Sequence, residues 1–130
     1  MHTEVPGRAL PLVSVVDDDR SIRESLPELL KAYGYAVRAF ASAEEFLASD
    51  CVDQTNCLIL DINMPGMSGP ELQAELAHSG RGGIPIIFIT AAVDRAVRAR
   101  VLAAQAVDFL YKPFTEDALL KALDAALGAR

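Results

Sequence analysis

The stretch CLILDINMPGMSG, residues 57–69, carries the strongest indication of the fold in this 130-residue chain. It opens with four apolar residues, 57–60, a run of strand length and apolar enough for a strand that is buried on both faces. The run stops at Asp61 and passes into a loop that contains Pro65 and Gly66. Such a strand predicts a parallel sheet with a carboxylate at one of its edges.

Four further runs rich in Val, Ile, Leu and Phe resemble this strand, and segments with helical periodicity separate them. The predicted strands are residues 12–16, 36–40, 57–60, 86–89 and 107–111. Regular alternation of strands and helices requires crossover connections, which produce a parallel sheet covered by helices on both faces. We therefore predict an α/β fold with a doubly wound, five-stranded parallel sheet and five helices.

Capping residues mark several helix ends. Gly34 is expected to close the first helix, whereas Ser42 and Thr115 are expected to begin later ones. Pro27 falls inside the first helix, where proline removes a backbone donor. We expect a kink at that position.

Composition favours a compact domain and argues against several other classes of protein. Apolar residues make up 52% of it, enough for a core, and we expect a tail at residues 1–11 and one domain at residues 12–130. No apolar stretch reaches the length of a signal peptide or a membrane span, which indicates a cytoplasmic protein. A net charge of −6 argues against direct nucleic-acid binding. Cys51 and Cys57 have no further ligands for zinc, and we interpret them as reduced thiols.

Acidic residues follow two of the predicted strands. Asp17, Asp18 and Asp19 come directly after the first strand, and Asp61 follows the third. If those strands are neighbours, the carboxylates meet where ligands gather in open α/β sheets. Clustered carboxylates repel one another unless a cation lies among them, and oxygen ligands suit Mg²⁺ better than zinc. The simpler interpretation is that Asp18 or Asp19 only caps the first helix.

Two further polar residues end strands at the same predicted edge. Thr90 follows the fourth strand, and Lys112 follows the fifth and precedes Pro113. Taken singly, these are an ordinary strand-end hydroxyl and a solvated charge. Taken with the aspartates, they offer a cation and a donor for a phosphoryl oxygen.

Four segments together resemble the response-regulator receiver family of two-component signal transduction. They are VDDD (16–19), LDINMPGMSG (60–69), TA (90–91) and KPF (112–114), within a match over residues 12–127. The resemblance extends to receivers of LuxR-type and nitrogen-fixation-type transcription regulators and to the chemotaxis response regulator. It implies a flavodoxin-like fold with strand order 2-1-3-4-5, the order found in a chemotaxis member of this family.

The resemblance also implies a role for each site residue. Asp61 is expected to be the phosphoacceptor. Asp18 and Asp61 are expected to bind Mg²⁺ through carboxylates, Asn63 through its backbone carbonyl, and Asp17 largely through bound water. Lys112 is expected to contact the phosphoryl oxygens.

The same resemblance predicts a switch beside the site. Thr90 is expected to move toward the phosphoryl group, and Phe109 is expected to turn inward into the vacated space. The Lys112–Pro113 bond is expected to be cis. These changes alter the face formed by the fourth helix, fifth strand and fifth helix.

The expected function is that of a signalling phosphoacceptor rather than an enzyme with a separate substrate. The phosphoryl donor is a sensor histidine kinase or a phosphotransfer protein, and the domain catalyses its own phosphorylation and slow autodephosphorylation. The output passes to a downstream protein partner or to a homodimer through the switch face, in a single-domain regulator or a transcription regulator. Opposite charges on this face favour a dimer, although two solvated helix faces remain the simpler interpretation. Those charges are Arg95, Arg98 and Arg100 on the fourth helix and Glu116, Asp117 and Asp124 on the fifth.

Two other functions remain open from the sequence. Asp17-x-Asp19 after an apolar strand resembles the nucleophile segment of haloacid-dehalogenase-type phosphatases, which usually have a longer chain. A receiver-like binding module that works without phosphorylation is the other alternative. The complete set of Asp17, Asp18, Asp61, Thr90 and Lys112 weighs against it.

Overall fold

The computed structural model describes residues 10–128, which contain a five-stranded parallel sheet in the order β2-β1-β3-β4-β5. This order and the alternation of strands and helices confirm the predicted fold. The expected tail lies mostly outside the described residues. The strands are β1 Leu12–Val16, β2 Ala36–Phe40, β3 Cys57–Asp61, β4 Ile86–Thr90 and β5 Asp108–Tyr111. The helices are α1 Arg20–Ala32, α2 Ala43–Ala48, α3 Gly69–His78, α4 Arg95–Ala103 and α5 Glu116–Ala126, with a 3₁₀ turn at Val52–Gln54.

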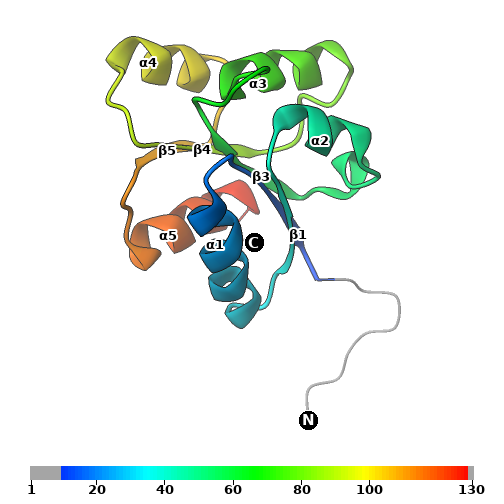
Figure 1. Ribbon diagram of the computed structural model, residues 1–130, viewed down its shortest axis with the longest axis vertical. Helices are drawn as coiled ribbons and strands as arrows, with labels where there is room; N and C mark the ends of the chain where they lie inside the picture. The colour runs from blue at the N-terminus through cyan, green and yellow to red at the C-terminus, as the bar shows by residue number, and fades with distance from the viewer. Residues whose placement is uncertain (1–9, 129–130) are drawn as a thin grey trace.

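Helices cover both faces of the sheet, with α1 and α5 on one face and α2, α3 and α4 on the other (Figure 1). Every residue of β3 and β4 is buried, as the continuous apolar runs predicted. Successive side chains of a strand point to opposite faces, so the sheet divides the core into two layers. In β3, Ile59 packs with Leu30 of α1 and Leu119 of α5, whereas Leu60 packs with Leu72 of α3.

The predicted capping residues are confirmed. Ser42 accepts a hydrogen bond from Glu45 N, and Thr115 accepts one from Ala118 N. Gly34 follows the end of α1 with φ of +95°, a left-handed conformation that glycine adopts without steric penalty. α1 runs through Pro27 as one 13-residue helix.

Neither cysteine forms a disulfide, and both are buried. Burial raises the pKa of the Cys57 thiol to about 12, so this thiol is protonated at neutral pH. Within residues 10–128, no helix combines the length and apolar character needed to cross a bilayer.

Parallel pairing brings four strand ends to one edge of the sheet. Val16 pairs with Leu60, and Asp61 pairs with Ile89. Thr90 pairs with Tyr111, the residue before Lys112. The polar residues that follow these strands therefore share one edge, and the site is built there.

Candidate functional site

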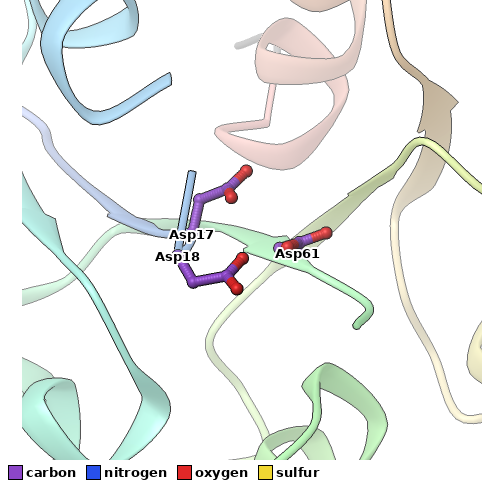
Figure 2. Close-up of side chains that lie close together, drawn as sticks. All are labelled: Asp17, Asp18 and Asp61. Atoms are coloured by element: carbon purple, nitrogen blue, oxygen red, sulfur yellow. The ribbon is translucent and has the colours of Figure 1, made fainter. Parts of the chain in front are cut away.

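Three carboxylates meet where β1 and β3 end. One oxygen each from Asp17, Asp18 and Asp61 lies within 4.8 Å of the others. Figure 2 shows their side chains gathered at this edge of the sheet. Asp17 and Asp61 are buried, whereas Asp18 is exposed. The convergence predicted from the sequence is thus present, with one member open to solvent.

Asp17 is the most enclosed of the three, with no exposed surface. Its Oδ1 accepts a hydrogen bond of 2.8 Å from Asp19 N, and its backbone carbonyl accepts one from Arg23. Its Oδ2 lies 2.8 Å from Lys112 Nζ, yet no donor within residues 10–128 meets this oxygen in hydrogen-bonding geometry. The contact is therefore an ion pair that leaves the oxygen with acceptor capacity.

Asp19 has the structural role that the simpler interpretation gave it. It is the N-cap of α1, and its carboxylate accepts a 2.9 Å hydrogen bond from Ser21 N. Asp18 does not cap the helix, and its carboxylate belongs to the acidic cluster. The neighbouring acids thus divide between holding the helix and forming the site.

Asp61, the residue at the end of β3, is only 5% exposed. Burial raises the pKa of its carboxyl group most, and the charge of Asp17 raises it further. The Lys112 ammonium lowers this pKa, while a hydrogen bond with Asp18 and the charge of Asp18 raise it, so that it reaches about 7. Without a cation in the site, Asp61 is therefore partly protonated near neutral pH.

This raised pKa predicts how stability changes with pH in the absence of divalent cations. The folded protein holds the Asp61 proton up to a pKa of about 7, above the ordinary value of 3.8, so stability falls as pH rises through this interval. Asp61→Asn removes the charge, and we expect it to raise the free energy of unfolding by about 2 kcal/mol at pH 8, with little gain near pH 4. Urea unfolding at both pH values tests this.

Asp124→Asn, a loss of the same charge at an exposed position of α5, is the matched control for that measurement. A gain at Asp61→Asn that is equal at both pH values would contradict the raised pKa. So would an equal gain in the Asp124→Asn control.

Lys112 brings the positive charge to the site. Its Nζ lies 2.8 Å from Asp17 Oδ2 and 3.8 Å from Asp61 Oδ1. Burial lowers the pKa of Lys112, but the close ion pair with Asp17 and the charge of Asp61 outweigh it, so the pKa is raised. The ammonium is therefore charged and directed at the acidic cluster. The Lys112–Pro113 peptide bond is cis.

Thr90 ends β4, the strand beside β3, and Phe109 lies in the next strand, β5. Thr90 is 1% exposed, and its hydroxyl accepts a hydrogen bond of 3.1 Å from Ala92 N. Phe109 is already buried at 6% exposure, with its ring 6.5 Å from that of Phe88 and 5.3 Å from that of Tyr111. The switch aromatic that was expected to turn inward thus occupies an inward position in this structure.

The loop after β3 holds residues whose importance the sequence did not reveal. A Cβ atom on Gly69 would lie 2.3 Å from the carbonyl oxygen of Asp61, so only glycine fits at the start of α3. Glu44 of α2 accepts a hydrogen bond of 3.0 Å from Met67 N and fixes the loop from the other side. Asn63 is exposed in this loop, two residues beyond Asp61. Glycine in a loop is too common to signal such a contact, and no sequence pattern indicated Glu44.

A comparison with known families decides what this arrangement belongs to. The response regulator receiver domain model matches residues 13–124. The chain belongs to the response regulator receiver family. Membership of this family, with its two-component signalling role, removes the haloacid-dehalogenase-type interpretation.

Individual relatives agree with this assignment. Nodulation protein W of Bradyrhizobium diazoefficiens is 47% identical over 125 residues, which cover 96% of this chain and 54% of that protein. The response regulator StyR is 48% identical with a TM-score of 0.85, over 93% of this chain and 61% of the other. Chemotaxis protein CheY4 of Vibrio cholerae is 33% identical with a TM-score of 0.81, over 92% of this receiver and all of that one (100%). The receiver thus spans about half of Nodulation protein W.

The acidic cluster also fits a divalent cation. All its donors are carboxylate oxygens, which suit Mg²⁺, and Asp17 Oδ2 is a buried acceptor without a hydrogen-bond donor among the described residues. A cation would lower the mutual repulsion that contributes to the raised pKa of Asp61. The acidic residues of this receiver therefore suit a magnesium ion.

Proposed function

We propose that this receiver accepts a phosphoryl group on Asp61 from a phosphohistidine of a sensor histidine kinase or a phosphotransfer protein, with Mg²⁺ as cofactor. The observation that carries the proposal is the position of Asp61. It is a buried carboxylate within 4.8 Å of two others and 3.8 Å from Lys112, at the end of a central strand. The cytoplasmic location predicted from the sequence remains part of this proposal.

In the proposed reaction, a carboxylate oxygen of Asp61 forms a bond to phosphorus as the bond between phosphorus and the histidine nitrogen breaks. Phosphoryl transfer requires a positioned nucleophile and neutralised charge. β3 and the Gly69 contact hold Asp61 in place, and the Lys112 ammonium pairs with the phosphoryl oxygens. Attack of water on the acyl phosphate later releases inorganic phosphate and regenerates the carboxylate.

We assign the cation to residues around Asp61. Asp18 and Asp61 would supply carboxylates, Asn63 its backbone carbonyl, and Asp17 would act largely through bound water. The Mg²⁺ supplies positive charge for the transferring phosphoryl group. Asp17 also has a role in the protein itself, because its ion pair orients Lys112 toward the site.

The proposed switch begins at Thr90 and ends at the face of α4, β5 and α5. The phosphoryl group adds about 1.5 to 2 negative charges and strong acceptors, which attract the Thr90 hydroxyl. Phe109 is already buried, so we propose that phosphorylation stabilises this inward arrangement rather than creating it.

The output of this switch would be a protein contact. Exposed arginines on α4 and exposed acids on α5 suit a homodimer or a charged partner, whereas direct contact with nucleic acid is disfavoured by the net charge of −6. The receiver spans about half of Nodulation protein W, and we propose that it works as a single-domain regulator or as the receiver part of a transcription regulator.

Incubation with acetyl phosphate tests the proposed phosphorylation. By intact mass, we expect wild type to gain one phosphoryl group with Mg²⁺ and little without it. Asp61→Asn is expected to gain none, and Asp124→Asn, an exposed control on α5, is expected to behave as wild type. Absence of any gain in wild type would favour the receiver-like module that binds without phosphorylation.

A further inference from the structure

Gln73 of α3 is a buried polar side chain between two helices. It is 9% exposed, and its Nε2 donates two hydrogen bonds to α4, to the carbonyl oxygens of Val101 and Ala104, each at 3.1 Å. α3 and α4 lie on the same face of the sheet (Figure 1). One amide group of α3 therefore joins directly to the backbone of its neighbour.

These two carbonyls lie at a helix end that needs partners. The last carbonyls of a helix have no intrahelical donor and require capping or solvent. Val101 O also accepts from Ala106 N, and the chain then turns through Gln105, whose φ of 80° is unusual for a residue other than glycine. Gln73 thus reinforces, from another helix, the backbone cap that residues 104–106 form at this end of α4.

The other end of α4 is held differently. Its N-cap is Asp94, whose carboxylate accepts a hydrogen bond from Val97 N. Only a short loop, residues 91–93, joins Thr90 to this N-cap. Val101 is the one fully buried residue of α4. The helix is therefore anchored to the body of the protein near its C-terminal end, while its N-terminal end follows the loop that begins at the site.

We propose that Gln73 is a positioning residue that fixes the C-terminal end of α4, so that changes at Thr90 move its N-terminal end about this point. The inference rests on the proposed function, because phosphorylation of Asp61 supplies the change at Thr90. On this proposal, the contact between α3 and α4 determines how the exposed Arg95 and Arg98 face a partner protein. The face formed by α4, β5 and α5 then changes because one end of α4 rotates.

Hydrogen exchange of the intact chain tests the anchor. Gln73→Met keeps the length and packing of the side chain but removes the donor. We expect amides 104–106 to exchange about tenfold faster in this variant, while the amides of α5 keep their rates. Gln54→Met, at an exposed glutamine of the 3₁₀ turn, is the matched control and is expected to leave amides 104–106 unchanged.

A variant that restores a donor separates hydrogen bonding from packing. The ammonium of Gln73→Lys can donate to the same carbonyls and is favoured at a helix C-terminus, so we expect it to recover most of the lost protection. Equal, fast exchange in the Met and Lys variants would overturn the proposal. So would unchanged exchange in Gln73→Met, or an acceleration that extends equally to α5.

Hydrogen exchange after treatment with acetyl phosphate and Mg²⁺ tests whether the C-terminal end of α4 stays fixed. The phosphoryl content of each sample is measured by intact mass. In phosphorylated wild type, we expect the exchange rate of Val97 N to change and amides 104–106 to stay protected. In Gln73→Met, both regions are expected to change. If phosphorylation of wild type changed the exchange rates of amides 104–106 as much as that of Val97 N, the proposal that the C-terminal end of α4 is fixed would be wrong. Absence of phosphoryl uptake would count against the proposed function, while the untreated samples would still decide whether Gln73 anchors α4.

Discussion

Lys112→Met is expected to lower the free energy of unfolding by about 3 kcal/mol at neutral pH without divalent cations. The variant removes the ammonium 2.8 Å from Asp17, whose side chain has no exposed surface. Removal of one partner from a buried pair leaves an uncompensated charge, and such losses are usually about 3 to 5 kcal/mol. Urea unfolding gives the size of this effect, and Mg²⁺ is expected to restore part of the stability.

Lys121→Met is the control for this measurement. Lys121 also pairs with an aspartate, Asp117, at 3.6 Å, but both side chains are about four-fifths exposed (79% and 83%). Exposed pairs contribute little, so we expect a change within about 0.5 kcal/mol. Similar losses for the two lysines would contradict the role of the buried Asp17–Lys112 pair.

The Lys112 variant is also expected to slow phosphoryl uptake from acetyl phosphate by at least about tenfold.

Gly69→Ala is expected to destabilise the receiver by about 3 kcal/mol and to disturb Asp61. The added Cβ would lie 2.3 Å from Asp61 O and 3.1 Å from Ile62 Cα, both backbone atoms that cannot turn aside as a side chain does. α3 or the end of β3 must shift, and overpacking of this kind commonly costs about 1 to 3 kcal/mol or more. Because Asp61 itself would move, uptake of the phosphoryl group is expected to fall with stability.

Gly83→Ala provides the matched control in the loop before β4. An added Cβ there would meet no atom within 4 Å, and Gly83 does not have a positive φ. Restricting the unfolded chain is expected to leave stability unchanged or raise it by up to about 1 kcal/mol. If Gly69→Ala were as stable as Gly83→Ala, the close approach of α3 to Asp61 would be wrong.

Much of the fold was predictable because its determinants are local in the sequence. The buried strands β3 and β4 are continuous apolar runs, and each differs by only one residue from its predicted end. Ser42 and Thr115 cap helices through residues three positions away, a spacing visible in the sequence. The strand order was not predictable from such patterns, and it came from the family resemblance.

The site was predictable as a set of residues but not as a set of contacts. Parallel strands bring their carboxyl ends to one edge, which was enough to place Asp17, Asp61 and Lys112 together. The contacts of Glu44 with Met67 and of Gln73 with α4 join residues more than 20 positions apart, and they depend on how helices pack. The inward position of Phe109 is a matter of side-chain conformation, which a sequence pattern does not specify.

The proposed function of Asp61 is opposed to the stability of the cation-free protein. The burial and negative charge that raise its pKa to about 7 lower the stability of the cation-free protein above that pH. Asparagine would be the more stable residue at this position. A buried aspartate with a raised pKa beside two others is typical of functional sites, and this is the physical argument that the position serves chemistry.

Chemical trapping of the phosphorylated residue tests the central claim, that Asp61 carries the phosphoryl group, most directly. Borohydride reduces an acyl phosphate of aspartate to homoserine, which survives digestion and is located by peptide fragmentation. Trypsin separates Asp17, Asp18 and Asp19, in peptide 9–20, from Asp61, in peptide 39–81. We predict homoserine at position 61 only, and only after treatment with acetyl phosphate and Mg²⁺. Homoserine in peptide 9–20, or at no position in a sample that has gained a phosphoryl group, would contradict the assignment of Asp61.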